Sequence, residues 1–216
     1  MKKREVIAVG ECYIIGAGSF YGLQTLPKEE DLVIAADGGL RHCREAGIRP
    51  DLVLGDFDSL GEIPQGAAVM RLPVEKDDTD TLAAIREGLR RGYTQFCIYG
   101  GTGGRRPDHT LANLQSLLFL AKRGGRGWLY DEYAVCTVLR NGTLRLRGEG
   151  DLSVFAMDGP ARGVTLRGLK YELSEHTLTP DFPLGVSNSF CGKTAEITVR
   201  DGTLLIWHGL TVEELP

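Results

Sequence analysis

The sequence predicts an α/β fold in which a mostly parallel, Rossmann-like α/β domain at residues 1–135 precedes an antiparallel β-sandwich domain at residues 136–216. Three observations predict it. Short apolar runs alternate with helical stretches up to about Asp131, and short β-like runs separated by turn residues fill the rest of the chain. The length of 216 residues fits one large domain or two small ones.

The first part of the chain has strand and helix patterns in succession. The helical periodicity is clearest where Leu111, Leu114 and Leu118 recur at three- and four-residue steps behind Asp108, a residue suited to a helix start. Such alternation is typical of a parallel sheet that is covered on both faces. The expected strands are 13–15, 32–35, 52–54, 67–72, 96–99 and 127–130, and the expected helices are 39–46, 79–91 and 108–123.

The second part, from about Tyr133, contains β-like runs and no helical pattern. Asn141-Gly142 and Asp201-Gly202 have the composition of hairpin turns, and Asp158-Gly159 and Gly168 also punctuate the runs. This spacing indicates antiparallel strands in a sandwich. The expected strands are 135–139, 143–147, 152–157, 162–166, 169–173, 194–200 and 203–207.

Composition excludes several classes of protein. A net charge of −4 with 25% charged residues argues against a basic nucleic-acid binder and against a disordered acidic chain. The sequence has no apolar run long enough for a transmembrane helix, so we expect no membrane partner. The five cysteines are far apart, which predicts neither a zinc site nor a disulfide framework and favours a reducing cytoplasm.

Carboxylates lie in the segments that follow three of the expected strands. Ligands bind outside the carboxyl ends of the strands in an open parallel sheet, so this position is informative. Converging carboxylates repel unless a divalent cation neutralises them, and Mg²⁺ prefers oxygen ligands. The alternative for any one pair is a polar turn. The carboxylates concerned are Asp37, Asp56, Asp58, Asp77 and Asp80.

A glycine run at residues 100–104 follows the strand expected at 96–99 and precedes a helix. Unhindered backbone N–H groups before a helix N-terminus suit phosphate, although a flexible surface turn has the same composition. The run matches neither a P-loop nor the G-x-G-x-x-G fingerprint. Arg105 and Arg106 behind it are suited to phosphate oxygens or to solvent, and His109 to general-base chemistry or to a capping turn. Gly16-x-Gly18 is left open.

Residue chemistry alone therefore predicts a magnesium- and phosphate-handling α/β enzyme with an appended β domain. No G-x-S-x-G nucleophile elbow is present, which argues against an esterase. The substrate does not follow from these patterns.

The order of the motifs resembles that of the thiamine pyrophosphokinase family. The similarity runs from about Tyr13 to Trp207, and six motifs in order are far more specific than any one of them. They are Ala36-Asp37-Gly38-Gly39, Gly55-Asp56-Phe57-Asp58-Ser59, Lys76-Asp77-x-Thr79-Asp80, Gly101-Thr102-Gly103-Gly104-Arg105 with Asp108-His109, Gly168-Leu169-Lys170-Tyr171-x-Leu173, and Val186-Ser187-Asn188-Ser189-Phe190.

The resemblance implies an ATP-dependent thiamine diphosphokinase. Such an enzyme transfers a pyrophosphoryl group from ATP to the hydroxyethyl oxygen of thiamine and releases AMP. The resemblance also implies Mg²⁺ as cofactor, ATP and thiamine as partners, and a cytoplasmic homodimer with sites between subunits. The alternatives are a related magnesium-dependent phosphotransferase or nucleotide hydrolase with another substrate, and a non-catalytic nucleotide sensor.

The resemblance carries roles onto individual residues. It implies Asp56, Asp58 and Asp80 as magnesium ligands, with Asp77 and Asp108 as further catalytic carboxylates. One departure is the Arg-Arg-Pro segment before Asp108, which leaves open which arginine faces phosphate. The implied ATP- and phosphate-binding residues are Asp37, Gly38, Gly101, Thr102, Gly103, Gly104, Arg105, Arg106 and His109, and the implied thiamine-binding residues are Lys76, Tyr171, Ser187 and Asn188.

Overall fold

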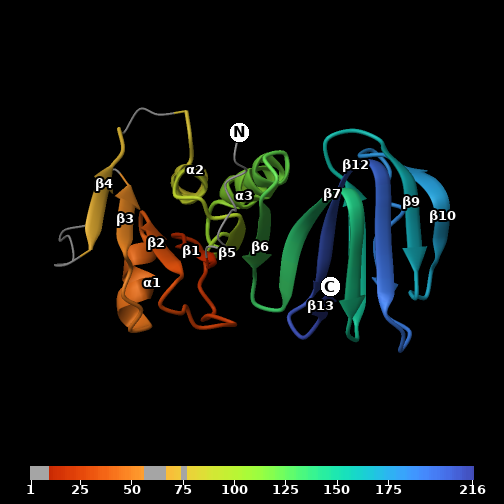
Figure 1. Cartoon of the computed structure of the whole chain (residues 1–216), viewed down its shortest axis with the longest axis horizontal. Coiled ribbons are helices and arrows are strands. Elements are labelled where there is room, and N and C mark those ends of the chain that lie inside the picture. Colours follow the sequence, from red (N-terminus) through yellow and green to blue (C-terminus); the bar gives the residue numbers. More distant parts are fainter. Residues whose placement is uncertain (1–9, 56–66, 74–76) are drawn as a thin grey trace, which may run out of the picture. The chain divides into compact units, whose positions relative to one another are not determined.

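The computed structural model describes residues 10–55, 67–73 and 77–216. The chain divides into two compact units, Met1–Glu132 and Tyr133–Pro216 (Figure 1). Within the described ranges, no helix is long and apolar enough to cross a membrane.

The first unit contains a parallel sheet with strand order β6-β5-β1-β2-β3-β4. The strand β1 therefore lies in the middle, with β2 on one side and β5 on the other. All four residues of β1 and all five of β2 are buried, as expected for strands covered on both faces. The strands are β1 (Cys12–Ile15), β2 (Leu32–Ala36), β3 (Leu52–Gly55), β4 (Ala68–Arg71), β5 (Gln95–Tyr99) and β6 (Arg126–Tyr130).

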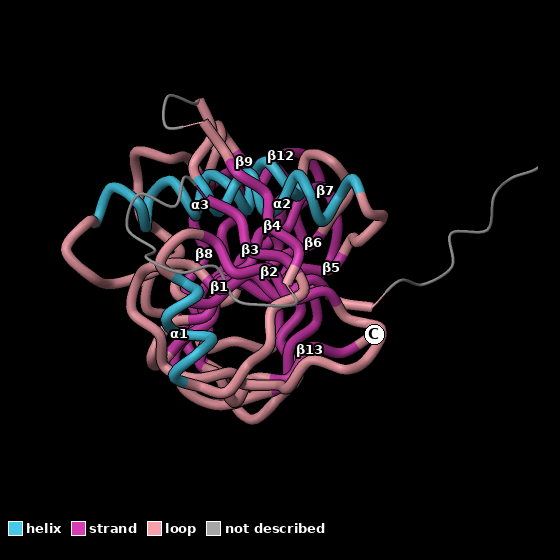
Figure 2. Tube along the Cα trace, turned by 90° about the vertical axis from the view of Figure 1, so that its left-hand side faces the viewer, coloured by secondary structure: helices cyan, strands magenta, loops and turns pink. Residues whose placement is uncertain are grey.

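Helices cover both faces of this sheet. α1 (Gly39–Glu45) lies on one face, and α2 (Asp80–Arg90) and α3 (Pro107–Ala121) lie on the other (Figures 1 and 2). Alternate strand residues such as Ile15 and Val33 pack with Leu40 of α1 in one apolar cluster. The prediction of a parallel α/β unit is confirmed, and each expected strand or helix lies within two residues of an observed one.

Local chemistry fixes where the two long helices begin. The Thr79 hydroxyl accepts a hydrogen bond from the Leu82 N–H at 3.2 Å and caps α2. Pro107 occupies the first turn of α3, where its missing N–H costs nothing, and Asp108 follows it beside the positive end of the helix dipole. Because α2 follows β4 and α3 follows β5 along the chain, both helices begin at the carboxyl edge of the sheet.

The second unit consists of antiparallel strands around one apolar core, which confirms the predicted β domain. The long strand β12 pairs with β7 along most of its length. Its first half also pairs with β9 and its second half with β8. The strands are β7 (Ala134–Arg147), β8 (Asp151–Ala156), β9 (Ala161–Arg167), β10 (Leu173–Leu178), β11 (Asn188–Ser189), β12 (Ala195–Gly209) and β13 (Glu213–Leu215).

Two predicted hairpin turns in this unit are wrong. Asn141-Gly142 lies inside β7 and Asp201-Gly202 lies inside β12, where the register shifts between Val199 and Thr203. The two irregularities face each other, and the Asn141 side-chain oxygen accepts a hydrogen bond from the Gly202 N–H at 2.9 Å. They are bulges at the level where β12 exchanges β9 for β8 as its second neighbour.

The strand expected at 169–173 is also wrong. Leu169 makes an isolated bridge to Phe190, and the strand β10 begins only at Leu173. Gly168 explains the interruption, because its φ of +69° turns the chain out of an extended conformation.

Candidate active site

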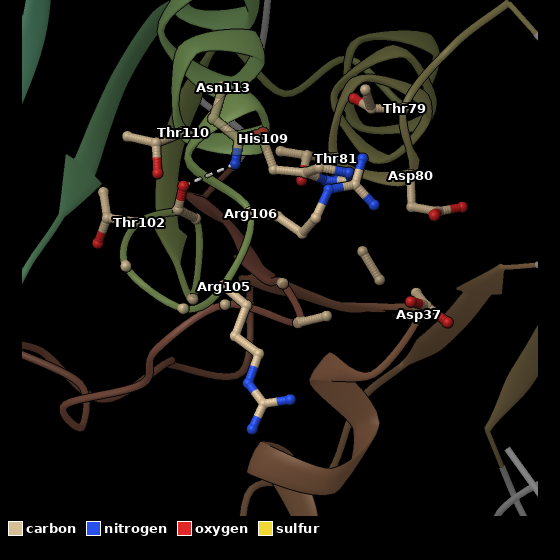
Figure 3. A pocket seen from close by; sticks show the side chains of 18 residues that line it. Asp37, Thr79, Asp80, Thr81, Thr102, Arg105, Arg106, His109, Thr110 and Asn113 are labelled. Carbon is tan, nitrogen blue, oxygen red and sulfur yellow. Dashed lines mark hydrogen bonds between the residues drawn. The ribbon is translucent and has the colours of Figure 1, made fainter. Parts of the chain in front are cut away.

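The carboxyl edge of the parallel sheet contains a pocket of about 290 Å³ (Figure 3). The chain passes from β1 to β2 in one direction and later returns to place β5 on the other side of β1. The strand order reverses at that point, which is where open α/β sheets bind ligands. Loops after β1, β2 and β5 line the pocket, together with the first turns of α2 and α3.

Two glycine-containing loops meet backbone to backbone on one wall. The Gly16 N–H donates to the Tyr99 carbonyl and the Gly18 N–H to the Gly100 carbonyl, both at 2.7 Å. A Cβ added at Gly18 would lie 2.6 Å from the Thr102 carbonyl oxygen. Glycine is therefore required here by close approach, and the Gly16-x-Gly18 segment that the sequence left open lines the pocket.

Two carboxylates line the pocket. Asp37 follows β2 with a φ of +49°, an uncommon conformation that its N–H stabilises by donating to the Leu54 carbonyl at 2.7 Å. Asp80 stands in the first turn of α2. Figure 3 shows the two side chains at the same end of the pocket, which makes this end acidic.

The two arginines behind the glycine run both line the pocket but differ in their partners. Arg106 forms a two-pronged ion pair with Asp108, with 3.0 Å between Nε and Oδ1 and 2.6 Å between Nη2 and Oδ2. These bonds lower the pKa of Asp108 to about 2. Arg105 extends away from Arg106 in Figure 3. Asp108 is thus absent from the pocket lining and contacts it through its exposed ion pair with Arg106.

Buried side chains hold the glycine run from behind. Asn113 on α3 donates from Nδ2 to the Gly101 carbonyl at 2.7 Å. The Thr102 hydroxyl donates to Asp131 Oδ1 at 2.9 Å. Sequence reasoning missed Asn113, because it stands in mid-helix without a motif. It also missed the lining residues Ala17, Thr81 and Thr110, and it named Ala36 and Thr79 in motifs without giving them a role.

The structure does not gather every expected residue in this pocket. Asp77 lines a separate hollow with Leu72 and Arg86. Gly38 caps the start of α1 and is absent from the pocket lining, whereas Gly101, Thr102, Gly103, Gly104 and His109 line it. The expected residues Asp56, Asp58 and Lys76 lie outside the described residues.

The donor set of the pocket suits Mg²⁺. Its described ligand-type groups include two carboxylates, Asp37 and Asp80, with threonine hydroxyls beside them, and hard oxygen donors of this kind bind Mg²⁺. Among the described residues, no group of three or more histidine, cysteine, aspartate or glutamate side chains converges on a metal position.

In the second unit the structure brings the three expected thiamine residues together. Asn188 is 3% exposed, and its Oδ1 accepts hydrogen bonds from the N–H groups of Tyr171 and Ser189, both at 2.9 Å. Its Nδ2 donates to the Tyr171 carbonyl at 2.6 Å. Asn188 therefore clamps the backbone that presents the Tyr171 ring, which is 59% exposed. The Ser187 N–H donates to the Ser153 hydroxyl at 3.1 Å.

Comparison with known proteins assigns the chain to a family. A sequence model described as thiamin pyrophosphokinase, catalytic domain matches residues 23–127, and one described as thiamin pyrophosphokinase, vitamin B1 binding domain matches residues 144–204. Together they cover about three quarters of the chain. The chain belongs to the thiamin pyrophosphokinase family.

Individual relatives agree with this family. The chain is 28% identical over 187 residues to thiamine pyrophosphokinase of Bacillus subtilis, covering 82% of this chain and 87% of that protein. The crystal structure of the Bacillus subtilis enzyme matches with a TM-score of 0.84 at 25% identity, over 94% of this chain and 100% of that one. Thiamin pyrophosphokinase from Geobacillus thermodenitrificans matches with a TM-score of 0.80 at 25% identity, over 93% and 97%.

A more distant structure has the same fold. Thiamin pyrophosphokinase from Candida albicans matches with a TM-score of 0.73 at 14% identity, over 94% of this chain and 91% of that one. With the family assigned, the chain is an ATP-dependent thiamine diphosphokinase, an enzyme that makes thiamine diphosphate from thiamine and ATP.

Proposed function

We propose that the chain transfers an intact pyrophosphoryl group from ATP to the hydroxyethyl oxygen of thiamine and releases AMP. The observation that carries the proposal is the pocket at the strand-order reversal, where glycine loops and two arginines face two carboxylates. An anionic nucleotide requires cationic groups and N–H groups at its phosphates. Transfer of a phosphoryl group also requires neutralisation of the charge on the transferred group and on the leaving group.

Positioning and electrostatics account for most of the rate in such a transfer. The thiamine hydroxyl attacks the β-phosphorus of ATP in line, and AMP leaves on the opposite side. Arg106, which forms a two-pronged ion pair with Asp108, would neutralise charge on the phosphate oxygens. We therefore favour Arg106 as the phosphate-facing arginine and Asp108 as its positioning residue.

The acidic end of the pocket is the proposed magnesium site, with Asp80 joined by Asp56 and Asp58 as ligands. When bound, Mg²⁺ would neutralise phosphate charge. Asp80, which lines the pocket, is better placed than Asp77 to orient the thiamine hydroxyl or to accept its proton.

Thiamine is proposed to contact the second unit through the exposed ring of Tyr171, which suits stacking on an aromatic heterocycle. Asn188 would act by holding Tyr171, and Ser187 and Lys76 would complete the contacts. The resemblance supports a homodimer with sites between subunits and a cytoplasmic location as parts of the same proposal.

The reaction is tested by following nucleotides released from Mg-ATP with and without thiamine. The proposal expects AMP and thiamine diphosphate in equal amounts, and only when thiamine is present. Thiamine-independent release of ADP would instead identify a nucleotide hydrolase. ATP binding without turnover would identify a nucleotide sensor.

A pair of aspartate variants tests the acidic site. We expect Asp80→Asn to lower kcat by about a hundredfold or more, because it removes a carboxylate ligand from the proposed magnesium site and with it part of the charge neutralisation at the phosphates. Asp78→Asn is the matched control, since Asp78 lies outside the pocket and pairs with Arg86 at 2.9 Å. Equal turnover in the two variants would contradict the assignment of Asp80.

A further inference from the structure

The carbonyl oxygens of the 100–102 turn are all occupied. A phosphate group is attracted by backbone N–H groups and repelled by carbonyl oxygens, so the direction of each peptide in a phosphate-facing turn matters. The Gly100 carbonyl accepts from the Gly18 N–H at 2.7 Å, and the Thr102 carbonyl accepts from the Ser19 N–H at 2.9 Å. The Gly101 carbonyl between them accepts from Asn113 Nδ2 at 2.7 Å.

The bond to Gly101 differs from its neighbours because a side chain supplies it. Asn113 is 6% exposed and projects from α3 into the lining of the pocket, as Figure 3 shows. Space around Gly101 is tight: a Cβ there would lie 3.2 Å from Asn113 Nδ2 and 2.5 Å from Leu129 Cδ1. The Gly101–Thr102 peptide is thus wedged between α3 and β6.

We propose that Asn113 is a positioning residue for ATP binding, which fixes the direction of the Gly101–Thr102 peptide by donating to the Gly101 carbonyl. A trans peptide directs its carbonyl and N–H to opposite sides, so the Asn113 bond acts on both, together with the antiparallel bridge between Ser19 and Thr102. Without the bond, rotation of the peptide exposes a carbonyl oxygen to the phosphates. The inference rests on the proposed function, since it assigns the 100–104 run to the phosphates of ATP.

The same helix supplies a matched control. Ser116 is 4% exposed on α3, and its hydroxyl donates to the Ala112 carbonyl at 2.9 Å inside the helix. Ser116→Ala therefore removes a buried hydrogen bond from α3 without touching the glycine run. Like the Asn113 variants it loses a buried side-chain hydrogen bond of α3, but Ser116 does not line the pocket.

The experiment compares Asn113→Asp, Asn113→Ala and Ser116→Ala. Asn113→Asp keeps the size of the side chain but sets a carboxylate oxygen against the Gly101 carbonyl, and Asn113→Ala removes the donor without adding charge. We expect both to raise the Kd for a non-hydrolysable ATP analogue with Mg²⁺ by about tenfold, the cost of one well-made buried bond. The KM for thiamine should change by less than about twofold in these variants.

Ser116→Ala should bind the ATP analogue within about twofold of the wild type, even if its Tm falls as far as that of Asn113→Ala. The proposal would be overturned if Asn113→Ala bound the analogue as tightly as Ser116→Ala does. Asn113→Ala adds no buried charge, so it keeps the test possible if Asn113→Asp fails to fold. If the wild-type chain makes no thiamine diphosphate, the proposed function fails. The analogue titration then still decides the role of Asn113.

Discussion

At the residue scale, the pocket depends on glycines where two stretches of backbone touch. Gly100 combines a φ of +62° with a position at which an added Cβ would overlap the Gly16 carbonyl. Gly104 stands four residues later in the same run with a φ of +75°, but a Cβ there would meet nothing within 4 Å. One position is restricted by conformation and by space, and the other by conformation alone.

This difference gives a prediction about stability. Gly104→Ala should cost about 1 kcal/mol of unfolding free energy, the usual cost of a left-handed alanine. Gly100→Ala should cost at least about 3 kcal/mol, because the loops after β1 and β5 must also separate. Urea denaturation of both variants measures the two values. Equal losses would show that the two loops do not press on each other at Gly100.

The residues of the pocket were predictable where chemistry and strand ends coincide. Asp37, Asp80 and the glycine run follow predicted strands, and the structure places them around one pocket. Asn113 was not predictable, because a buried asparagine in a helix has no pattern of its own until the loop that it holds is known. Gly16-x-Gly18 was equally undecidable before the central position of β1 was known.

At the element scale, strands buried on both faces were the easiest to predict. They form continuous apolar runs that end at glycine or aspartate, as β2 and β3 do. The long strands of the second unit were harder. Asn141-Gly142 has the composition of a tight turn, yet pairing with β12 keeps β7 continuous through it. Local sequence chemistry cannot distinguish a bulge from a turn when the partner strand decides.

The helix α2 carries a buried carboxylate that makes its stability depend on pH. Glu87 is 5% exposed and accepts hydrogen bonds from Arg90 and Arg91, each at 2.7 Å. These bonds lower the pKa of Glu87 from its ordinary value near 4.5 to about 2. The lowered pKa means that protonation of Glu87 favours the unfolded chain.

We therefore expect the contribution of Glu87 to be complete above about pH 4.5 and to be lost as the pH falls towards 2. A fall in the pKa of Glu87 from 4.5 to about 2 corresponds to roughly 3 kcal/mol of unfolding free energy. Glu87→Gln removes the titrating group, so its unfolding free energy should vary less over this range than that of the wild type. Urea titrations at intervals of pH measure both slopes, and parallel slopes would exclude Glu87 as the titrating group.

At the scale of the whole molecule, the two family models match different units of the chain. The match to the catalytic-domain model falls within the first unit, and the match to the vitamin B1 binding model falls within the second. Each unit also has its own apolar core. Separate cores allow the stability of one unit to change without altering the geometry of a pocket built wholly within the other.

A core substitution in the second unit tests this separation. Ile197 is fully buried in the core that β7, β8, β9 and β12 enclose. Ile197→Ala should cost about 2 to 5 kcal/mol, because it removes buried methyl groups and leaves a cavity. Glu196→Ala on the same strand is the control, since its exposed ion pair with Arg145 contributes about 1 kcal/mol or less.

At a temperature where both variants remain folded, they should bind the ATP analogue within about twofold of the wild type, because the described residues that line the pocket all belong to the first unit. Isothermal titration calorimetry measures that affinity, and differential scanning calorimetry measures the loss of stability. A tenfold weaker affinity in Ile197→Ala, with Glu196→Ala unchanged, would mean that packing in the second unit fixes the geometry of the nucleotide pocket. The two units would then be energetically coupled despite their separate cores.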